Sequence, residues 1–100
     1  MSHIFISYSR KDIEIAERIV IALADNKLDT WIDWKSIPKG EDWEMEIYHG
    51  IEEADVFLFL ISFDSVRSEM CNKEILHAVK NGKRILPIFI SKGKDNEVYS

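Results

Sequence analysis

Cysteine, glycine and proline are all scarce in this sequence, and each shortage excludes a class of protein. Cys71 is the single cysteine, which excludes an internal disulfide framework and a multi-cysteine zinc site and fits a reducing compartment. Four glycines and two prolines stand beside 46% hydrophobic residues, a composition typical of a globular chain rather than a disordered one. One hundred residues are enough for one domain.

An excess of basic charge and a long apolar run are missing as well. Thirteen Lys and Arg against eighteen Asp and Glu give a formal net charge of −5, which provides no field to gather nucleic acid or an acidic membrane surface. No uninterrupted apolar run is longer than the six residues of Val56–Ile61, far shorter than a membrane span, and the N-terminus turns polar too early for a signal peptide. We therefore expect a soluble, cytoplasmic protein without nucleic-acid or membrane partners.

Several catalytic and cofactor motifs are also absent. The sequence contains no G-x-G-x-x-G, no G-x-x-x-x-G-K-[ST] and no G-x-S-x-G, so dinucleotide-binding glycine loops, P-loops and the α/β-hydrolase elbow are excluded. The histidines, His3, His49 and His77, have no metal-ligand spacing, and we expect no metal site.

Apolar runs alternate with amphipathic segments along the chain. The pattern predicts strands at His3–Tyr8, Leu28–Asp33, Val56–Ile61 and Arg84–Ile90. It predicts helices from Ser9 to about Asn26, from Asp42 to about Ala54, and from Asp64 or Ser65 to Asn81–Gly82, with Gly82 as the residue that ends the last helix. Such alternation favours a parallel sheet covered by helices on both faces. Residues 91–100 read as a flexible tail, and the apolar edge at Arg84–Ile90 suggests a piece of a longer polypeptide.

Ligands of parallel sheets bind beyond the carboxyl ends of the strands, and one carboxylate on the third predicted helix meets that condition. Ser68, Cys71 and Glu74 form a stripe at three-residue spacing, beside a buried face that we expect to contain Ile75, Ala78 and Val79. Glu74 then lies at the border of the buried face, partly desolvated, as catalytic carboxylates often are. The structural alternative is a half-exposed glutamate paired with Lys73 or Lys80, with Cys71 a small core residue.

The segment after the second strand is a long loop at the same edge. It contains Pro38 and Gly40, and its length hints at a function. Trp34 can stack on a flat ring or cover the sheet edge, whereas Trp43 starts the apolar face of the next helix and favours core packing. Arg10 and its neighbour Lys11 can hold phosphate or remain solvated, and Ser62 and Phe63 can line the same cleft.

The combined motifs resemble a TIR (Toll/interleukin-1 receptor) domain over nearly the whole chain. Ile4–Ser9 is similar to the family's first box, Asp33–Gly40 to its BB loop, Ala54–Ser62 and Lys83–Ile90 to its strands C and D, and Ser68–Glu74 to the S-x-x-C-x-x-E pattern of the enzymatic branch. The resemblance implies an α/β fold, a three-layer flavodoxin-like parallel sheet with strand order 2-1-3-4. The family normally continues through a fourth helix, a fifth strand and a last helix, which this chain lacks.

The resemblance also implies a catalytic role for Glu74, because the matching glutamate of TIR enzymes cleaves the nicotinamide–ribose bond of NAD. One carboxylate suffices, since nicotinamide leaves as a neutral ring and needs no general acid, and the carboxylate stabilises an oxocarbenium-like centre. Many enzymatic members carry tryptophan where this chain has Met70. By the same resemblance the substrate would be framed by Tyr8, Ser9, Arg10, Asp33, Trp34, Lys35, Trp43, Ser62, Ser68, Met70 and Cys71.

The expected function is therefore that of an NAD+ nucleosidase, which uses NAD as substrate and gives nicotinamide with ADP-ribose or a cyclic isomer. The resemblance implies the effector domain of a bacterial immune protein, activated when TIR domains assemble head to tail. The BB loop would make that contact through Ser36, Ile37, Pro38, Lys39 and Gly40. Two alternatives are a non-catalytic interaction module and a nucleoside-processing transferase with a carboxylate nucleophile.

Overall fold

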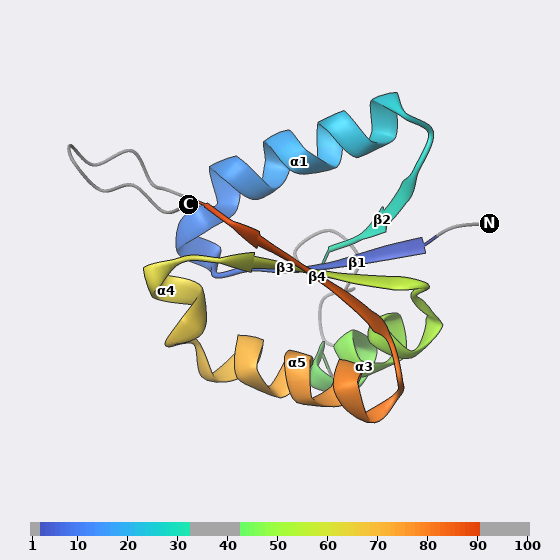
Figure 1. The fold of residues 1–100 in the computed structure, drawn as a ribbon, viewed down its shortest axis with the longest axis vertical. Helices are drawn as coiled ribbons and strands as arrows, with labels where there is room; N and C mark the ends of the chain where they lie inside the picture. The colour runs from blue at the N-terminus through green and yellow to red at the C-terminus, as the bar shows by residue number, and fades with distance from the viewer. Residues whose placement is uncertain (1–2, 33–42, 91–100) are drawn as a thin grey trace.

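A computed structural model describes residues 3–32 and 43–90 (Figure 1). The predicted tail at residues 91–100 and the predicted loop at residues 33–42 lie outside this part. The elements are, in chain order, β1 (His3–Ser7), the short 3-10 helix η1 (Arg10–Asp12), α1 (Ile13–Asp25), β2 (Asp29–Trp31), α3 (Trp43–Glu53), β3 (Val56–Ile61), α4 (Phe63–Val66), α5 (Glu69–Lys80) and β4 (Arg84–Phe89).

The described strands form one parallel sheet in the order β2-β1-β3-β4, which confirms the α/β fold class and the predicted strand order. β1 is central, since Ile4 pairs with Thr30 on one side and with Val56 on the other. In Figure 1, α1 covers one face of the sheet, while α3 and α5 cover the other. The carboxyl ends of all these strands meet at one edge, where β1 leads into η1 and β3 leads into α4.

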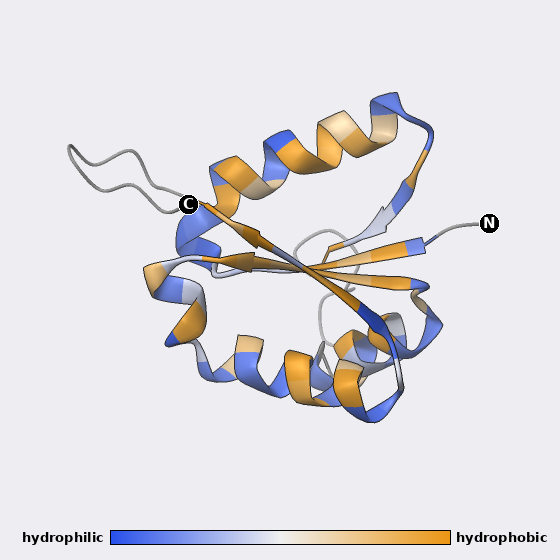
Figure 2. Cartoon of the chain, in the orientation of Figure 1, coloured by the Kyte–Doolittle hydropathy of each residue, from blue (hydrophilic) through white to orange (hydrophobic). Residues whose placement is uncertain are grey.

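The two faces follow from the alternation of side chains along each strand. Ile6 and Tyr8 point to the α1 side, where they pack with Leu58 and Leu60 of β3 and with Ala16 of α1. Figure 2 shows both central strands as hydrophobic along most of their length, as expected for strands buried on both faces. In the described ranges, no helix combines the length and the apolar character needed to cross a membrane.

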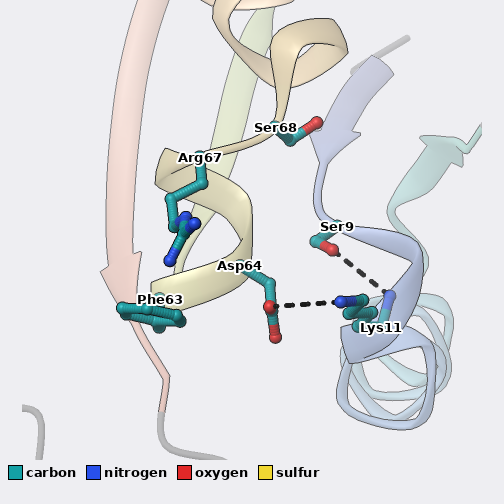
Figure 3. A pocket seen from close by; sticks show the side chains of 6 residues that line it. All are labelled: Ser9, Lys11, Phe63, Asp64, Arg67 and Ser68. Carbon is teal, nitrogen blue, oxygen red and sulfur yellow. Dashed lines mark hydrogen bonds and ion pairs between the residues drawn. The ribbon is translucent and has the colours of Figure 1, made fainter.

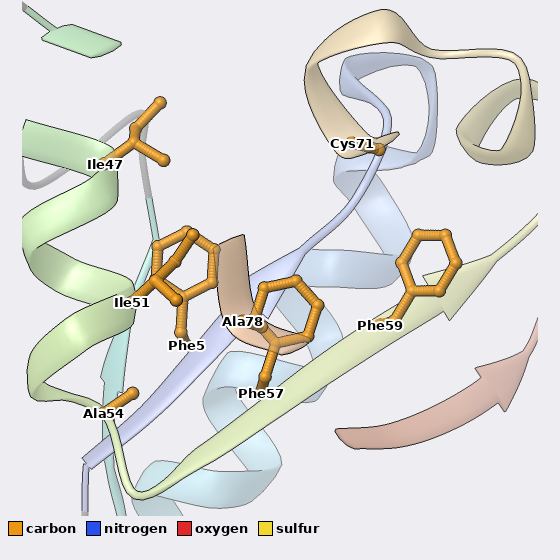
Figure 4. Close-up of a cluster of buried hydrophobic side chains, with 8 residues drawn as sticks. All are labelled: Phe5, Ile47, Ile51, Ala54, Phe57, Phe59, Cys71 and Ala78. Atoms are coloured by element: carbon orange, nitrogen blue, oxygen red, sulfur yellow. The ribbon is translucent and has the colours of Figure 1, made fainter. Parts of the chain in front are cut away.

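The opposite face carries the second apolar cluster, between the sheet and helices α3 and α5 (Figure 4). Its buried members are Phe5, Ile47, Ile51, Ala54, Phe57, Phe59, Cys71 and Ala78. Phe5 stacks on Trp31 with ring centroids 5.1 Å apart and on Phe57 at 5.5 Å, so three adjacent strands share one aromatic row. Gly50 permits this row, because a Cβ there would lie 2.7 Å from the Trp31 ring.

The third predicted helix is wrong in one respect, because the structure has two helices where the sequence pattern predicted one. α4 begins after Ser62, whose hydroxyl accepts from the Ser65 N–H while the Ser65 hydroxyl accepts from the Ser62 N–H. The chain is extended again at Ser68, with φ −77° and ψ 123°, and α5 starts there. Two serine N-caps six positions apart thus begin two separate helices.

Predictions for the end of α5 are confirmed at one residue and wrong at another. Gly82 has φ +67°, the left-handed conformation expected of the glycine after a helix, and its N–H donates to the Val79 carbonyl. Val79 itself is 59% exposed, so it does not belong to the buried face. β4 is an edge strand of the described sheet, and Leu86, Ile88 and Phe89 are exposed along it.

Candidate functional site

Glu74 is buried against the carboxyl-terminal end of β1. It is only 3% exposed, whereas its sequence position predicted a half-buried side chain at a border. The Ser7 hydroxyl, at the last residue of β1, donates to Glu74 Oε1 over 2.6 Å. Strand alternation explains the contact, because Ser7 shares a face with Phe5 and this is the face that α5 covers. The structure thus favours a buried carboxylate over the half-exposed alternative.

Helix α5 presents Glu74 through the spacing that the sequence indicated. The Ser68 hydroxyl caps the helix by accepting from the Cys71 N–H at 3.1 Å. Cys71, one turn on, is 2% exposed within the apolar cluster, which confirms its alternative interpretation as a small core residue. Glu74 follows after another turn and lies at the same buried face as Ala78.

Tyr48, on helix α3, interacts electrostatically with Glu74. The Tyr48 hydroxyl donates to Glu44 Oε2 at 3.0 Å. Burial raises the pKa of Tyr48, and the hydrogen bond to Glu44 and the charges of Glu44 and Glu74 raise it further. Lys73 Nζ lies 3.7 Å from the same Glu44 carboxylate, so this lysine has an acidic partner on α3.

The α3–α5 contact continues toward the other end of the helices. The His77 ring stacks on Tyr48, with centroids 4.5 Å apart, and its Nε2 lies 2.7 Å from Glu52 Oε2. Lys83 Nζ donates to the Glu52 backbone carbonyl at 2.6 Å. These contacts fix α5 to α3 and therefore fix the helix that carries Glu74.

A second buried carboxylate joins η1 to the start of α4. Asp12 is 2% exposed, and its Oδ2 accepts from the Ser62 hydroxyl at 2.5 Å. Ser62 is therefore used twice, as the cap of α4 and as the donor to Asp12. This link holds two segments of the carboxyl edge together across fifty residues of sequence.

An open pocket of about 400 Å³ lies at this edge between η1 and α4 (Figure 3). Its lining residues are Ser9, Lys11, Phe63, Asp64, Arg67 and Ser68. Lys11 Nζ is 3.8 Å from Asp64 Oδ1, and the Arg67 guanidinium lies 4.8 Å from the centre of the Phe63 ring. The pocket thus combines two cations, one carboxylate and an exposed ring. Within the described part of the chain, Glu74 does not line it, although Ser68 begins the helix that carries Glu74.

The remaining residues of the predicted site are not brought together in one place. Ser9 and Ser68 line the pocket, while Arg10 is exposed on η1 and Met70 packs at the margin of the apolar cluster. Tyr8 is 5% exposed in the α1-side cluster, on the opposite face of the sheet from Glu74. Trp43 begins α3. Outside the described residues lie Asp33, Trp34, Lys35, Ser36, Ile37, Pro38, Lys39 and Gly40.

Sequence reasoning missed Ser7, Tyr48 and Arg67 as neighbours of the site. Ser7 had a signal, because a period of two along His3–Tyr8 places it on the face of Phe5 rather than that of Tyr8. Tyr48 had a weaker one, since it follows Glu44 by one helical turn. Arg67 had none, because its place depends on the break between α4 and α5.

The fold places this protein in the class of parallel α/β proteins, with a buried acid at the carboxyl edge of the sheet. The comparison with protein families then identifies the family within this class, since the family model described as "TIR domain" matches residues 4–99. The chain therefore belongs to the TIR domain family. A comparison with curated proteins found no match.

Solved structures share the fold at low sequence identity. The TIR domain of a Toll-related receptor from Hydra magnipapillata superposes with a TM-score of 0.78 at 21% identity, covering 96% of this chain and 74% of that one. A TIR-STING receptor from C. gigas gives 0.77 at 23% identity, covering 94% of this chain but 32% of that one. The CMP N-glycosidase BcmB of Clostridium botulinum gives 0.69 at 19% identity, covering 88% and 71%. At these identities the likeness establishes the fold.

Proposed function

We propose that this TIR domain hydrolyses the nicotinamide–ribose bond of NAD+ and that Glu74 is its catalytic residue. The observation that carries the proposal is the burial of the Glu74 carboxylate at the carboxyl edge of the sheet, where it accepts a hydrogen bond from Ser7. A buried carboxyl group on this otherwise apolar face needs polar partners, because burying such a group without them is unfavourable.

A lone carboxylate is sufficient for this reaction. Nicotinamide leaves as a neutral ring from a pyridinium, so the leaving group needs no proton, and the remaining task is to stabilise positive charge that develops on the ribose. In the proposal, Glu74 contacts the ribose hydroxyls, and its negative charge stabilises the positive charge that develops on the sugar. Water then attacks the sugar to give ADP-ribose, or a group of the substrate itself attacks to give a cyclic isomer.

The pocket beside α4 supports a dinucleotide as the substrate. Lys11 and Arg67 bring two cations to its wall, and NAD carries a diphosphate that such cations bind. The exposed Phe63 ring adds a flat apolar surface, which suits a base. By the resemblance to TIR domains, the proposal also assigns Asp33, Trp34 and Lys35 to substrate binding.

We further propose that activity requires assembly with other TIR domains, as in the effector domain of a bacterial immune protein. Ser36–Gly40 would form the contact between neighbouring subunits, head to tail. Turnover per subunit would then rise with protein concentration, and Pro38→Ala or Gly40→Ala would reduce that rise.

The test is the release of nicotinamide from NAD+ by a wild-type protein and by matched glutamate variants. Glu74→Gln keeps the shape of the side chain and removes its charge, so we expect nicotinamide release to fall by a factor of about a hundred or more. Glu69→Gln, on the exposed side of the same helix, is the control and should retain activity. Turnover that survives Glu74→Gln would exclude the assignment. Because BcmB is a CMP N-glycosidase, CMP belongs in the same substrate panel.

A second candidate function is a non-catalytic interaction module, favoured by the apolar side chains along β4. Leu86 is 44% exposed and Phe89 55%, an apolar surface that suits a protein partner. If Leu86→Ser and Phe89→Ser abolish self-association while no N-glycosidic substrate is ever consumed, this function replaces the first.

A further inference from the structure

Ser7 is a buried hydroxyl on a strand face that is otherwise apolar. It is 1% exposed and has Phe5 before it on the same face. A hydroxyl buried without a partner is destabilising, so such groups are nearly always hydrogen-bonded. The partner of Ser7 is Glu74, which lies 67 positions later in the sequence. The pair is therefore made by the fold and not by local geometry.

The hydrogen bond of the pair is short and buried. The Ser7 hydroxyl donates to Glu74 Oε1 over 2.6 Å, at the short end of the range for O–H···O hydrogen bonds. One oxygen of the glutamate is therefore held directly against β1.

The donor lies on a central strand of the described sheet. Ser7 pairs in register with Phe59 of β3, and β1 lies between β2 and β3 in the middle of the sheet. Glutamate has three side-chain torsions to fix, and a site is held most accurately when its supporting group lies on a strand or helix of the scaffold. Helix α5 sets the Glu74 backbone, and Ser7 sets its carboxylate.

We propose that Ser7 is a positioning residue for Glu74: its hydroxyl holds the carboxylate in the one orientation that serves the ribose. The inference rests on the proposed NAD hydrolysis and adds a second residue to it. Ser7 acts through Glu74 and does not itself contact the substrate. Its loss leaves the binding surface intact and misplaces the charge that stabilises the transition state.

The experiment measures kcat and KM for NAD+ with the wild-type protein, Ser7→Ala and Ser7→Thr. Misplacement of a catalytic group by about 1 Å can lower the rate a hundredfold, so we expect Ser7→Ala to lower kcat about tenfold to a hundredfold. KM should stay within about twofold, because ground-state binding is unchanged. Ser7→Thr keeps the hydroxyl and should recover most of kcat.

Ser65→Ala is the control for a merely structural effect. Ser65 is a fully buried serine at the same edge of the sheet, and its recorded hydrogen bonds are to Ser62. Its replacement should lower the unfolding temperature and leave kcat of the folded protein unchanged. If Ser7→Ala does not fold, Ser7→Cys takes its place, since a thiol has similar volume but donates weakly.

The outcomes separate the two proposals. A wild-type protein that releases no nicotinamide overturns both of them. Wild-type turnover with kcat unchanged in Ser7→Ala overturns the positioning role alone, and so does an equal loss of kcat in Ser7→Ala and Ser65→Ala. A loss confined to Ser7→Ala, with recovery in Ser7→Thr, supports it.

Discussion

The two faces of the sheet are built differently. On the α1 side, Ile6, Leu58 and Leu60 pack into a cluster whose buried members are nearly all hydrocarbon. On the α3–α5 side, an equally apolar cluster contains the Ser7–Glu74 hydrogen bond. Both faces exclude water, but Glu74 is buried beside the second cluster, whereas the other buried acid, Asp12, lies at the sheet edge where η1 meets α4. Both faces therefore stabilise the fold, and under the proposed function the α3–α5 side also carries the chemistry.

The largest expected effect on stability is the loss of the central ring on the α3–α5 side. Phe5 is fully buried between Trp31 and Phe57, so Phe5→Ala should lower the free energy of unfolding by about 3–5 kcal/mol. Leu60→Ala on the α1 side should lower it by about 2–5 kcal/mol. Urea unfolding followed by circular dichroism measures both. Similar losses would show that the two faces contribute alike to stability, and a negligible loss for Phe5→Ala would contradict the described packing.

A smaller effect is expected where α3 meets the aromatic row. An added methyl group at Gly50 would lie 2.7 Å from the Trp31 ring, so Gly50→Ala should destabilise the domain by about 1–3 kcal/mol although alanine favours helices. Its control is Gly82→Ala, where space is open and the φ of +67° alone opposes the change. Thermal unfolding distinguishes them, and an increase in stability for Gly50→Ala would refute the close approach.

The phenol of Tyr48 offers a third test of the α3–α5 side. Burial and the carboxylates of Glu44 and Glu74 raise its pKa above the ordinary value of about 10. A raised folded-state pKa contributes stability that is present below the unfolded value and is lost as the pH rises through the folded value. Unfolding free energy should therefore fall above about pH 10, and the fall should be shallower in Tyr48→Phe. Equal slopes in the two proteins would contradict this interaction.

The smallest stability change is expected from replacing Ser7 and Glu74 together. Replacing both partners of a buried hydrogen bond by apolar groups of similar shape is often nearly neutral, so Ser7→Ala combined with Glu74→Met should alter the unfolding free energy by about 1 kcal/mol or less. The same double variant should release no nicotinamide. A large destabilisation would instead make the pair a structural element of the core.

Local periodicity allowed the parallel sheet and the Ser68–Cys71–Glu74 stripe to be predicted, whereas the strand order was implied by the resemblance to TIR domains. It did not reveal the break before α5, since the serine caps leave the apolar period almost undisturbed. It also underestimated the burial of Glu74 and overestimated that of Val79. Both errors have one cause. The helical periodicity shows which residues share a side of the helix, but it does not show which of them the sheet covers.

The central claim is that the Glu74 carboxylate performs the chemistry, and its most direct test compares two glutamines on one helix. Nicotinamide released from NAD+ is measured by chromatography for Glu74→Gln and Glu69→Gln at equal concentrations of folded protein. The account predicts turnover in Glu69→Gln and a loss of about a hundredfold or more in Glu74→Gln. Equal turnover in the two variants would contradict it.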